Sequence, residues 1–264
     1  MKLGFIGLGN MATAMIGGLI ENNMATPADI FGSAHTKASV ENIVSKYEIT
    51  GCDDNLSVVR SSDVIIVAVK PQMYEEVLSE IKGEVTGDKI IVSIAPGKSL
   101  EWLAGILGDN VKIVRCMPNT PALVGEGCTG VCRNGNITDK DMDLVMQILS
   151  SFGKAYEVKE SAMDAVVAVS GSSPAYVFIF IEAMADAAVA AGLPRSEAYK
   201  FAAQAVYGSA KMVLETGRHP ADLKDMVCSP AGTTIEAVRV LEEKGLRGAV
   251  MDAMKACADK SRSM

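Results

Sequence analysis

The chain of 264 residues is poor in aromatic side chains, in histidine and in clustered basic residues. Aromatic residues make up 5% of the sequence, which argues against a surface that stacks nucleic-acid bases. The net charge is −7 and no long block of Lys or Arg occurs, so a nucleic-acid partner is not expected. The two histidines and six cysteines lack the spacing of zinc ligands, so we expect no metal site.

Targeting signals are also missing from the sequence. The apolar run from Leu3 to Leu8 is short and is broken by Gly4 and Gly7, unlike the core of a signal peptide. The scattered cysteines are typical of a reduced, cytoplasmic protein. The most apolar later stretch, residues 175–191, contains two acidic residues, so we expect a buried helix there and no membrane partner.

The first half of the chain alternates strand and helix patterns, which predicts crossover units and a parallel sheet. Hydrophobic residues make up 49% and charged residues 22%, as in folded globular proteins. We therefore expect an α/β fold with a Rossmann-type, doubly wound, mostly parallel sheet. The expected strands are Lys2–Gly7, Ile30–Ser33, Asp63–Val69, Lys89–Ile94 and Val111–Arg115, and the clearest helices among them are Asn10–Asn22 and Lys37–Tyr47.

Strand patterns end near residue 160, and helical spacing dominates the rest of the chain. We predict a dinucleotide-binding domain over residues 1–160 and an all-helical C-terminal domain over residues 161–264. The expected helices are Asp164–Val169, Pro174–Ala191, Ser196–Thr216, Thr233–Lys244 and Leu246–Lys260. The second of these is apolar nearly all round and must be covered on every side, which predicts a dimer with interleaved helical domains.

A glycine-rich turn follows the first predicted strand and opens a helix. Its sequence, Gly7-Leu8-Gly9-Asn10-Met11-Ala12, matches GxGxxA in the context of a dinucleotide fingerprint. Gly7 permits the tight turn, Gly9 leaves space for the pyrophosphate, and Ala12 lets the helix pack on the sheet. The free N–H groups of the helix start then face the phosphates. The alternative is a glycine-rich turn without a ligand.

The residues at the end of the second predicted strand indicate whether such a fold binds NADPH or NADH. An acidic side chain there would bind the ribose 2′-hydroxyl, but the sequence reads Ser33-Ala34-His35-Thr36-Lys37. Hydroxyls, a histidine and a lysine suit a 2′-phosphate better. We predict NADPH, with NADH as the alternative.

Further polar groups follow later strands and helices. Lys70, in Val69-Lys70-Pro71, stands at the carboxyl end of the strongest strand, where such sheets bind ligands. The run Ser229-Pro230-Ala231-Gly232-Thr233-Thr234 precedes a helix and is suited to bind a small carboxylate. Ordinary helix capping is the more common use of such residues.

At these positions the sequence resembles pyrroline-5-carboxylate reductase, over nearly the whole chain. The shared segments are Phe5–Ala12, Val67–Pro71, Met117–Gly127, Ser170–Tyr176, Gly192–Arg195 and Leu223–Thr234. The last two are the most specific to the family. Ala231 departs from the family, which commonly has glycine there.

The resemblance implies hydride transfer from NAD(P)H to the C5=N bond of a cyclic imine, giving L-proline. It implies that Ser229 and the N–H groups of Gly232, Thr233 and Thr234 bind the substrate carboxylate. The Thr234 hydroxyl would bond the ring nitrogen, and Glu160 would line the substrate pocket. The implied and predicted cofactor residues together are Gly7, Leu8, Gly9, Asn10, Met11, Ala12, Ser33, His35, Thr36, Asn55, Ala68, Val69, Lys70, Pro71 and Ala95. The family forms dimers through its helical domain, and often larger assemblies, commonly decamers.

Two other functions share parts of this pattern. A β-hydroxyacid dehydrogenase also joins a Rossmann domain to helices, but its lysine base has no equivalent in Ser170–Tyr176. A catalytically silent NADPH-binding regulator would keep Gly7–Ala12 without needing the Ser229–Thr234 run. An imine that already carries positive charge needs little acid–base help, which agrees with the lack of a histidine or acid pair beside these runs.

Overall fold

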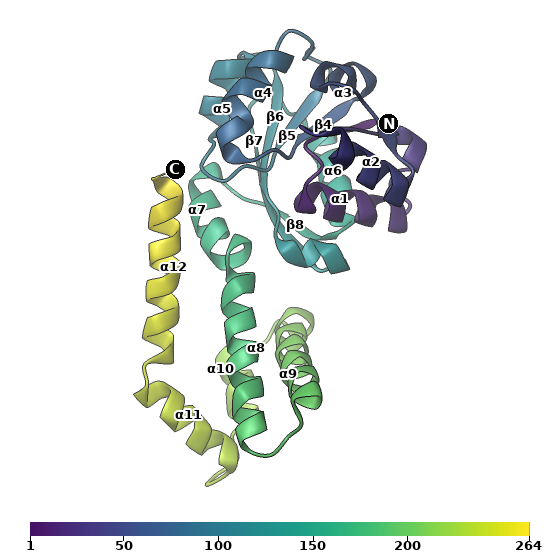
Figure 1. Cartoon of the computed structure of the whole chain (residues 1–264). Helices are drawn as coiled ribbons and strands as arrows, with labels where there is room; N and C mark the ends of the chain where they lie inside the picture. The colour runs from purple at the N-terminus through teal and green to yellow at the C-terminus, as the bar shows by residue number, and fades with distance from the viewer. Residues whose placement is uncertain (264) are drawn as a thin grey trace. The chain divides into compact units, whose positions relative to one another are not determined.

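The computed structural model describes residues 1–263, and its first unit is built on an eight-stranded sheet (Figure 1). The strand order is β3-β2-β1-β4-β5-β6-β7-β8, and every neighbouring pair is parallel except β6 and β7. The expected Rossmann-type, mostly parallel sheet is therefore confirmed. The strands are β1 Leu3–Ile6, β2 Ile30–Ser33, β3 Thr50–Gly51, β4 Val64–Val67, β5 Ile90–Ser93, β6 Lys112–Met117, β7 Gly127–Arg133 and β8 Gly153–Glu157.

The central strands are buried on both faces because helices cover both sides of the sheet. Alternate residues of β4 belong to different cores: Val64 and Ile66 pack on one side, Ile65 and Val67 on the other. Apolar residues of α1, α2 and α6 complete the first core, and those of α3, α4 and α5 complete the second. These helices are α1 Asn10–Glu21, α2 Lys37–Tyr47, α3 Asn55–Ser61, α4 Tyr74–Ile81, α5 Leu100–Leu107 and α6 Asp139–Ser150.

Helices alone make up the second unit of the chain. Contacts between residues divide the described chain into residues 1–172 with 257–263, and residues 173–256. Within the first unit, the C-terminal end of the chain is tied to residues just after position 160, since Asp164 accepts a hydrogen bond from Ser261 (2.7 Å). The remaining helices are α7 Met163–Val166, α8 Ser173–Ala190, α9 Arg195–Thr216, α10 Pro220–Val227, α11 Thr233–Glu243 and α12 Leu246–Arg262.

Helix α8, which the sequence predicts to be covered by a second copy of the chain, is largely exposed in the single chain. Ala185 is its one buried residue, and Phe178 and Ile179 are 62% and 66% exposed. The reason is that the hydrophobic cluster within this unit is small, being built around Ala185, Ala198 and Ala202. The segment Glu160–Ala190 is long and apolar enough to cross a membrane, by length and composition only.

Candidate active site

The carboxyl ends of four neighbouring parallel strands form one edge of the sheet. Ile6 of β1 is in register with Ser33 of β2 and with Val67 of β4, and Val67 is in register with Ser93 of β5. The loops that follow these strands therefore begin side by side. All the predicted cofactor residues except Asn55 lie in these loops or at the strand and helix ends beside them, and doubly wound sheets bind ligands at this edge.

The glycine turn has the shape that the sequence predicts. Gly7 has a φ of +95°, and a Cβ there would lie 2.8 Å from the carbonyl of Ala68, so only glycine fits. Gly9 is the N-cap of α1, and a Cβ there would have no atom of another described residue within 4 Å, apart from its two chain neighbours. Folding therefore does not require glycine at position 9. The open space lies at a helix start that no described side chain caps, as a bound pyrophosphate requires.

Ser33 and Asn55 come together beyond the end of β2. The Ser33 hydroxyl donates to Asn55 Oδ1 (2.7 Å), and Asn55 Nδ2 donates to Glu80 Oε2 (2.7 Å). Thr36 is the N-cap of α2, where its Oγ1 accepts the N–H of Ser39 (3.3 Å). His35 is exposed beside it. In folds of this type the end of the second strand is where the cofactor ribose binds.

The ends of β4 and β5 are linked by a residue that sequence reasoning missed. Tyr74 is fully buried, and its hydroxyl donates to the carbonyl of Val67 and accepts the N–H of Ile94 (3.1 Å). Lys70 is exposed in the loop between Val67 and Tyr74, and Ala95 is buried just after Ile94. A tyrosine at the start of an amphipathic helix gives no sequence signal for this position.

The carboxylate of Glu160 is held inside the first unit. Its Oε1 accepts hydrogen bonds from Arg115 Nη1 (2.9 Å) and from the N–H of Leu100 at the start of α5 (2.7 Å). The Arg115 side chain is 8% exposed and that of Glu160 is 34% exposed. Arg115 was not predicted from the sequence. The partly exposed face of Glu160 remains accessible to a ligand.

Asn119 is a second buried polar residue and lies within the segment Met117–Gly127, where the sequence predicted no site residue. Its Nδ2 donates to the carbonyl of Ser170 (3.0 Å), and its Oδ1 accepts the N–H of Cys128 (2.8 Å). The side chain thereby ties the loop after β6 to β7 and to the start of the Ser170–Ser173 run. It holds the irregular helical turn at Val167–Gly171 in place.

The run Ser229–Thr234 forms a tight turn at the start of α11. The N–H of Gly232 donates to the carbonyl of Ser229 (3.0 Å), and Ala231 has a φ of +56°. Proline second and a left-handed residue third are typical of a type II turn. A Cβ on Gly232 would lie 2.3 Å from Ser229 Oγ, so the Ser229 hydroxyl would have to rotate away from its present position.

The helix that follows this turn starts without a side-chain cap. Gly232 is the N-cap of α11, and among the described residues no side chain accepts its first N–H groups. The capping interpretation of Ser229, Thr233 and Thr234 therefore does not hold. The N–H groups of Thr233 and Thr234 remain available for an anion, and the Thr234 side chain is half-buried beside them.

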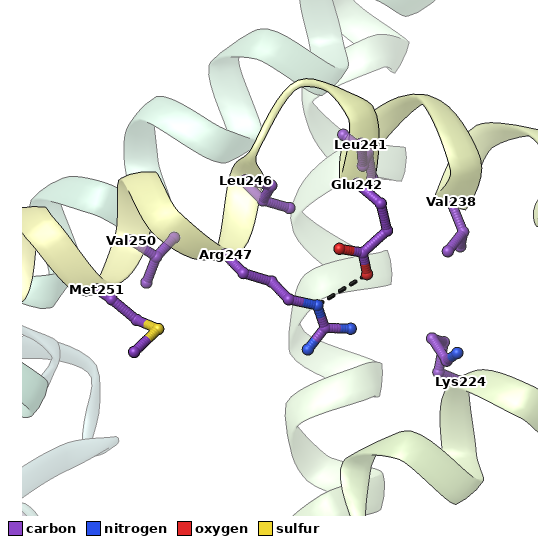
Figure 2. Close-up of a pocket in the computed structure, with 8 residues that line it drawn as sticks. All are labelled: Lys224, Val238, Leu241, Glu242, Leu246, Arg247, Val250 and Met251. Atoms are coloured by element: carbon purple, nitrogen blue, oxygen red, sulfur yellow. Dashed lines mark hydrogen bonds and ion pairs between the residues drawn. The ribbon is translucent and has the colours of Figure 1, made fainter.

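A separate groove of about 560 Å³ lies among α10, α11 and α12 (Figure 2). Its walls include Val238, Leu246 and Val250, and Arg247 Nε donates to Glu242 Oε1 (2.8 Å) beside them. None of the predicted site residues lines it. The groove is mainly apolar and holds no arrangement suited to the reduction of a small polar substrate.

The fold and the glycine turn define a class: a dinucleotide-dependent oxidoreductase of the Rossmann type. Residues 2–97 match the family model described as NADP oxidoreductase coenzyme F420-dependent. Residues 160–264 match the one described as pyrroline-5-carboxylate reductase dimerisation.

Full-length relatives narrow the class to one family. The chain is 53% identical over 263 residues to pyrroline-5-carboxylate reductase of Escherichia coli K12, covering 100% of this chain and 98% of the relative. It is 44% identical to that of Methanosarcina acetivorans, covering 100% and 97%. A crystal structure of the Plasmodium falciparum pyrroline carboxylate reductase with NADP bound superposes with a TM-score of 0.91 at 35% identity, covering 100% and 97%. This chain belongs to the pyrroline-5-carboxylate reductase family.

Proposed function

We propose that the chain transfers a hydride from NADPH to the C5=N bond of 1-pyrroline-5-carboxylate and so makes L-proline, in the last step of proline biosynthesis. The observation that carries this proposal is the uncapped start of α11 behind the Ser229–Gly232 turn, in a member of this reductase family. A silent regulator would have no use for this site. A β-hydroxyacid dehydrogenase would need a lysine base, which Ser170–Tyr176 lacks.

NADPH fits the carboxyl edge of the sheet, where the open space at Gly9 leaves room for its pyrophosphate. When bound, the cofactor supplies the hydride. Ser33, His35, Thr36 and Asn55 would hold its adenosine ribose with the 2′-phosphate, and the loop of Ala68, Val69, Lys70 and Pro71 would hold the other half beside Ala95. Gly7, Leu8, Gly9, Asn10, Met11 and Ala12 would hold the pyrophosphate through backbone N–H groups and close packing.

The substrate carboxylate would bind at the start of α11. Ser229 Oγ and the N–H groups of Gly232, Thr233 and Thr234 would bind its oxygens, with support from the helix dipole. Thr234 would act as the catalytic residue by bonding the ring nitrogen, and Glu160 would line the pocket. Because a protonated imine already attracts a hydride, these residues need only hold and orient the ring and exclude water.

The exposed apolar face of α8 is consistent with self-association. We propose residues 1–160 as the dinucleotide-binding domain and residues 161–264 as the substrate-binding and dimerisation domain. Burial of Phe178 and Ile179 by a second copy would remove apolar area from water, at about 25 cal/mol per Å². We also propose that dimers assemble further, into decamers as is common in the family, and that the protein is cytoplasmic and has no membrane partner. Light scattering tests the dimer, since a stable monomer at low concentration would contradict it.

The experiment that tests the reaction mixes the protein with NADPH and racemic pyrroline-5-carboxylate and follows loss of reduced-nicotinamide absorbance. Rapid oxidation with formation of proline is the expected result. No turnover with NADPH or NADH, from folded protein that binds NADPH, would overturn the proposal. Comparison of kcat/KM for the two cofactors tests the 2′-phosphate site, and a preference for NADH would contradict the assignment to Ser33, His35 and Thr36.

A further inference from the structure

The hydroxyl of Tyr74 connects β4 and β5 at the carboxyl edge of the sheet, where the cofactor residues are proposed to lie. It is the first residue of α4 and is fully buried. Its hydroxyl donates to the carbonyl of Val67, the last residue of β4, and accepts the N–H of Ile94, the first residue after β5 (3.1 Å). The phenol therefore bridges two backbone groups on neighbouring strands.

These two backbone groups would otherwise be partners in the sheet. At the other end of the same strand pair, the N–H of Ile90 donates directly to the carbonyl of Asp63 (3.0 Å). Hydrogen-bonding groups on one side of a strand recur every second residue. Four residues further along each strand, the N–H of Ile94 thus falls opposite the carbonyl of Val67, in agreement with the pairing of Val67 with Ser93. The hydroxyl stands between them and replaces the next direct bond.

The bridge lies under the loops that are assigned to the cofactor. Residues 68–73 connect Val67, the last residue of β4, to Tyr74, the first residue of α4. The hydrogen bond from Tyr74 to the Val67 carbonyl therefore joins the two ends of this loop. Ala95 follows directly after the other bridged residue, Ile94. An inserted hydroxyl keeps the strand ends further apart than a direct N–H to carbonyl bond would, while leaving neither group unpaired.

We propose that Tyr74 is a positioning residue that sets the spacing of the β4 and β5 ends, and with it the geometry of the loops at Lys70 and Ala95 that hold the dinucleotide. This inference rests on the proposed function of that edge. Burial raises the pKa of the Tyr74 phenol, so the hydroxyl keeps its proton and remains a donor throughout the working pH range. Tyr74 does not touch the reacting atoms and acts only through the backbone that it holds.

The test is Tyr74→Phe, which keeps the buried ring and removes only the hydroxyl. We expect the Kd and KM for NADPH to rise about tenfold, with kcat within about twofold of wild type, because the loops lose their spacing but the chemistry is unchanged. Hydrogen exchange of the Ile94 amide should also become faster. Direct binding of NADPH is measured by calorimetry with the full chain, beside thermal unfolding of each variant.

Ser151→Ala provides the matched control. The Ser151 hydroxyl is also buried and also donates to a backbone carbonyl, that of Ile148 (2.6 Å), but it lies at the end of α6. This variant should lose stability and keep the wild-type Kd for NADPH. Wild-type affinity in Tyr74→Phe, or an equal loss in both variants, would overturn the inference alone. A wild-type chain that fails to bind NADPH would overturn both the inference and the proposed function.

Discussion

Arg115 and Glu160 form an ion pair within the first unit, with Arg115 Nη1 2.9 Å from Glu160 Oε1. Arg115 is almost fully buried on β6, and Glu160 begins the short turn before α7. The same carboxylate oxygen accepts a hydrogen bond from the N–H of Leu100 and so satisfies the first backbone donor of α5. One side chain therefore neutralises a buried charge and binds the first N–H of a helix, while part of its carboxylate stays exposed.

Removal of the Glu160 carboxylate should destabilise the first unit. Glu160→Ala leaves Arg115 buried without its partner, and we expect a loss of about 1–3 kcal/mol, less than for a fully buried pair because Glu160 is partly exposed. Chemical denaturation at one fixed protein concentration measures the change. The double variant Arg115→Met with Glu160→Ala removes the unpaired charge and should recover part of the loss. A double variant no more stable than Glu160→Ala would contradict this account.

Asp141 supplies a pH-dependent contribution to stability at the start of α6. Its carboxylate accepts the N–H of Thr138 (3.1 Å) in a capping box and lies 2.9 Å from Lys112 Nζ. Burial acts to raise the pKa of Asp141, but hydrogen bonds from Thr138 and Lys112 outweigh it, and the pKa lies below its ordinary value. The stabilisation is thus present above the unfolded pKa of about 4 and is lost as pH falls through the lower folded pKa.

Asp141→Asn should therefore be less stable than wild type by about 0.5–2 kcal/mol at neutral pH. The difference should shrink as pH falls from about 4 through the lower pKa of the folded state, below which the wild-type carboxylate is protonated too. Urea unfolding across this pH range measures both values. Asp139→Asn is the control, since the Asp139 side chain is 92% exposed in its pair with Arg133 and should change stability by less than about 0.5 kcal/mol. A difference independent of pH would disprove the assignment.

Substitution of Gly9 should weaken cofactor binding while leaving the fold intact. A Cβ at this position meets no described residue within 4 Å apart from its two chain neighbours, so Gly9→Ala should fold, with a capping loss of at most about 1 kcal/mol. The added methyl group occupies the approach of the pyrophosphate, and the Kd for NADPH should rise about tenfold or more. Calorimetric titration with NADPH measures it.

The control for Gly9→Ala is Gly105→Ala. Gly105 lies inside α5 and also has open space around it, so alanine should stabilise the helix by about 0.5–1 kcal/mol. Its affinity for NADPH should equal that of wild type. Equal affinity in Gly9→Ala would mean that the pyrophosphate does not approach this helix start.

Elements with a clear local pattern of residues were predicted correctly from the sequence. The second strand and second helix have the predicted bounds, and Gly7 has the positive φ that its role requires. Strands β3, β7 and β8 were missed, and β3 has only two residues. β7 contains Gly130, where a Cβ would lie 2.5 Å from Val166, so close packing selects glycine and weakens the strand pattern. β8 is an edge strand and mostly polar. Short α10 was missed because it begins with Pro220, and proline more commonly marks a break in a helical pattern.

Side-chain partners distant in sequence could not be predicted. Arg115 and Glu160 are separated by 45 residues, and no pattern links them. The Tyr74 bridge depends on the direction of one side chain beneath a loop, which periodicity does not give. For the Ser229–Thr234 run, the residue types favoured capping, and only the backbone geometry leaves the helix start open.

Thr233 and Thr234 are adjacent in the first turn of α11, and neither side chain caps the helix. Separate substitution of each therefore tests which hydroxyl the reaction needs. Thr234→Ala should lower kcat/KM for the imine about 5- to 150-fold, the cost of one lost hydrogen bond to the ring nitrogen. Thr233→Ala keeps its backbone N–H, through which Thr233 is proposed to act, and should stay within about threefold of wild type. Steady-state kinetics with NADPH saturating measure both. A wild-type rate in Thr234→Ala, or an equal loss in both variants, would remove Thr234 from the catalytic site.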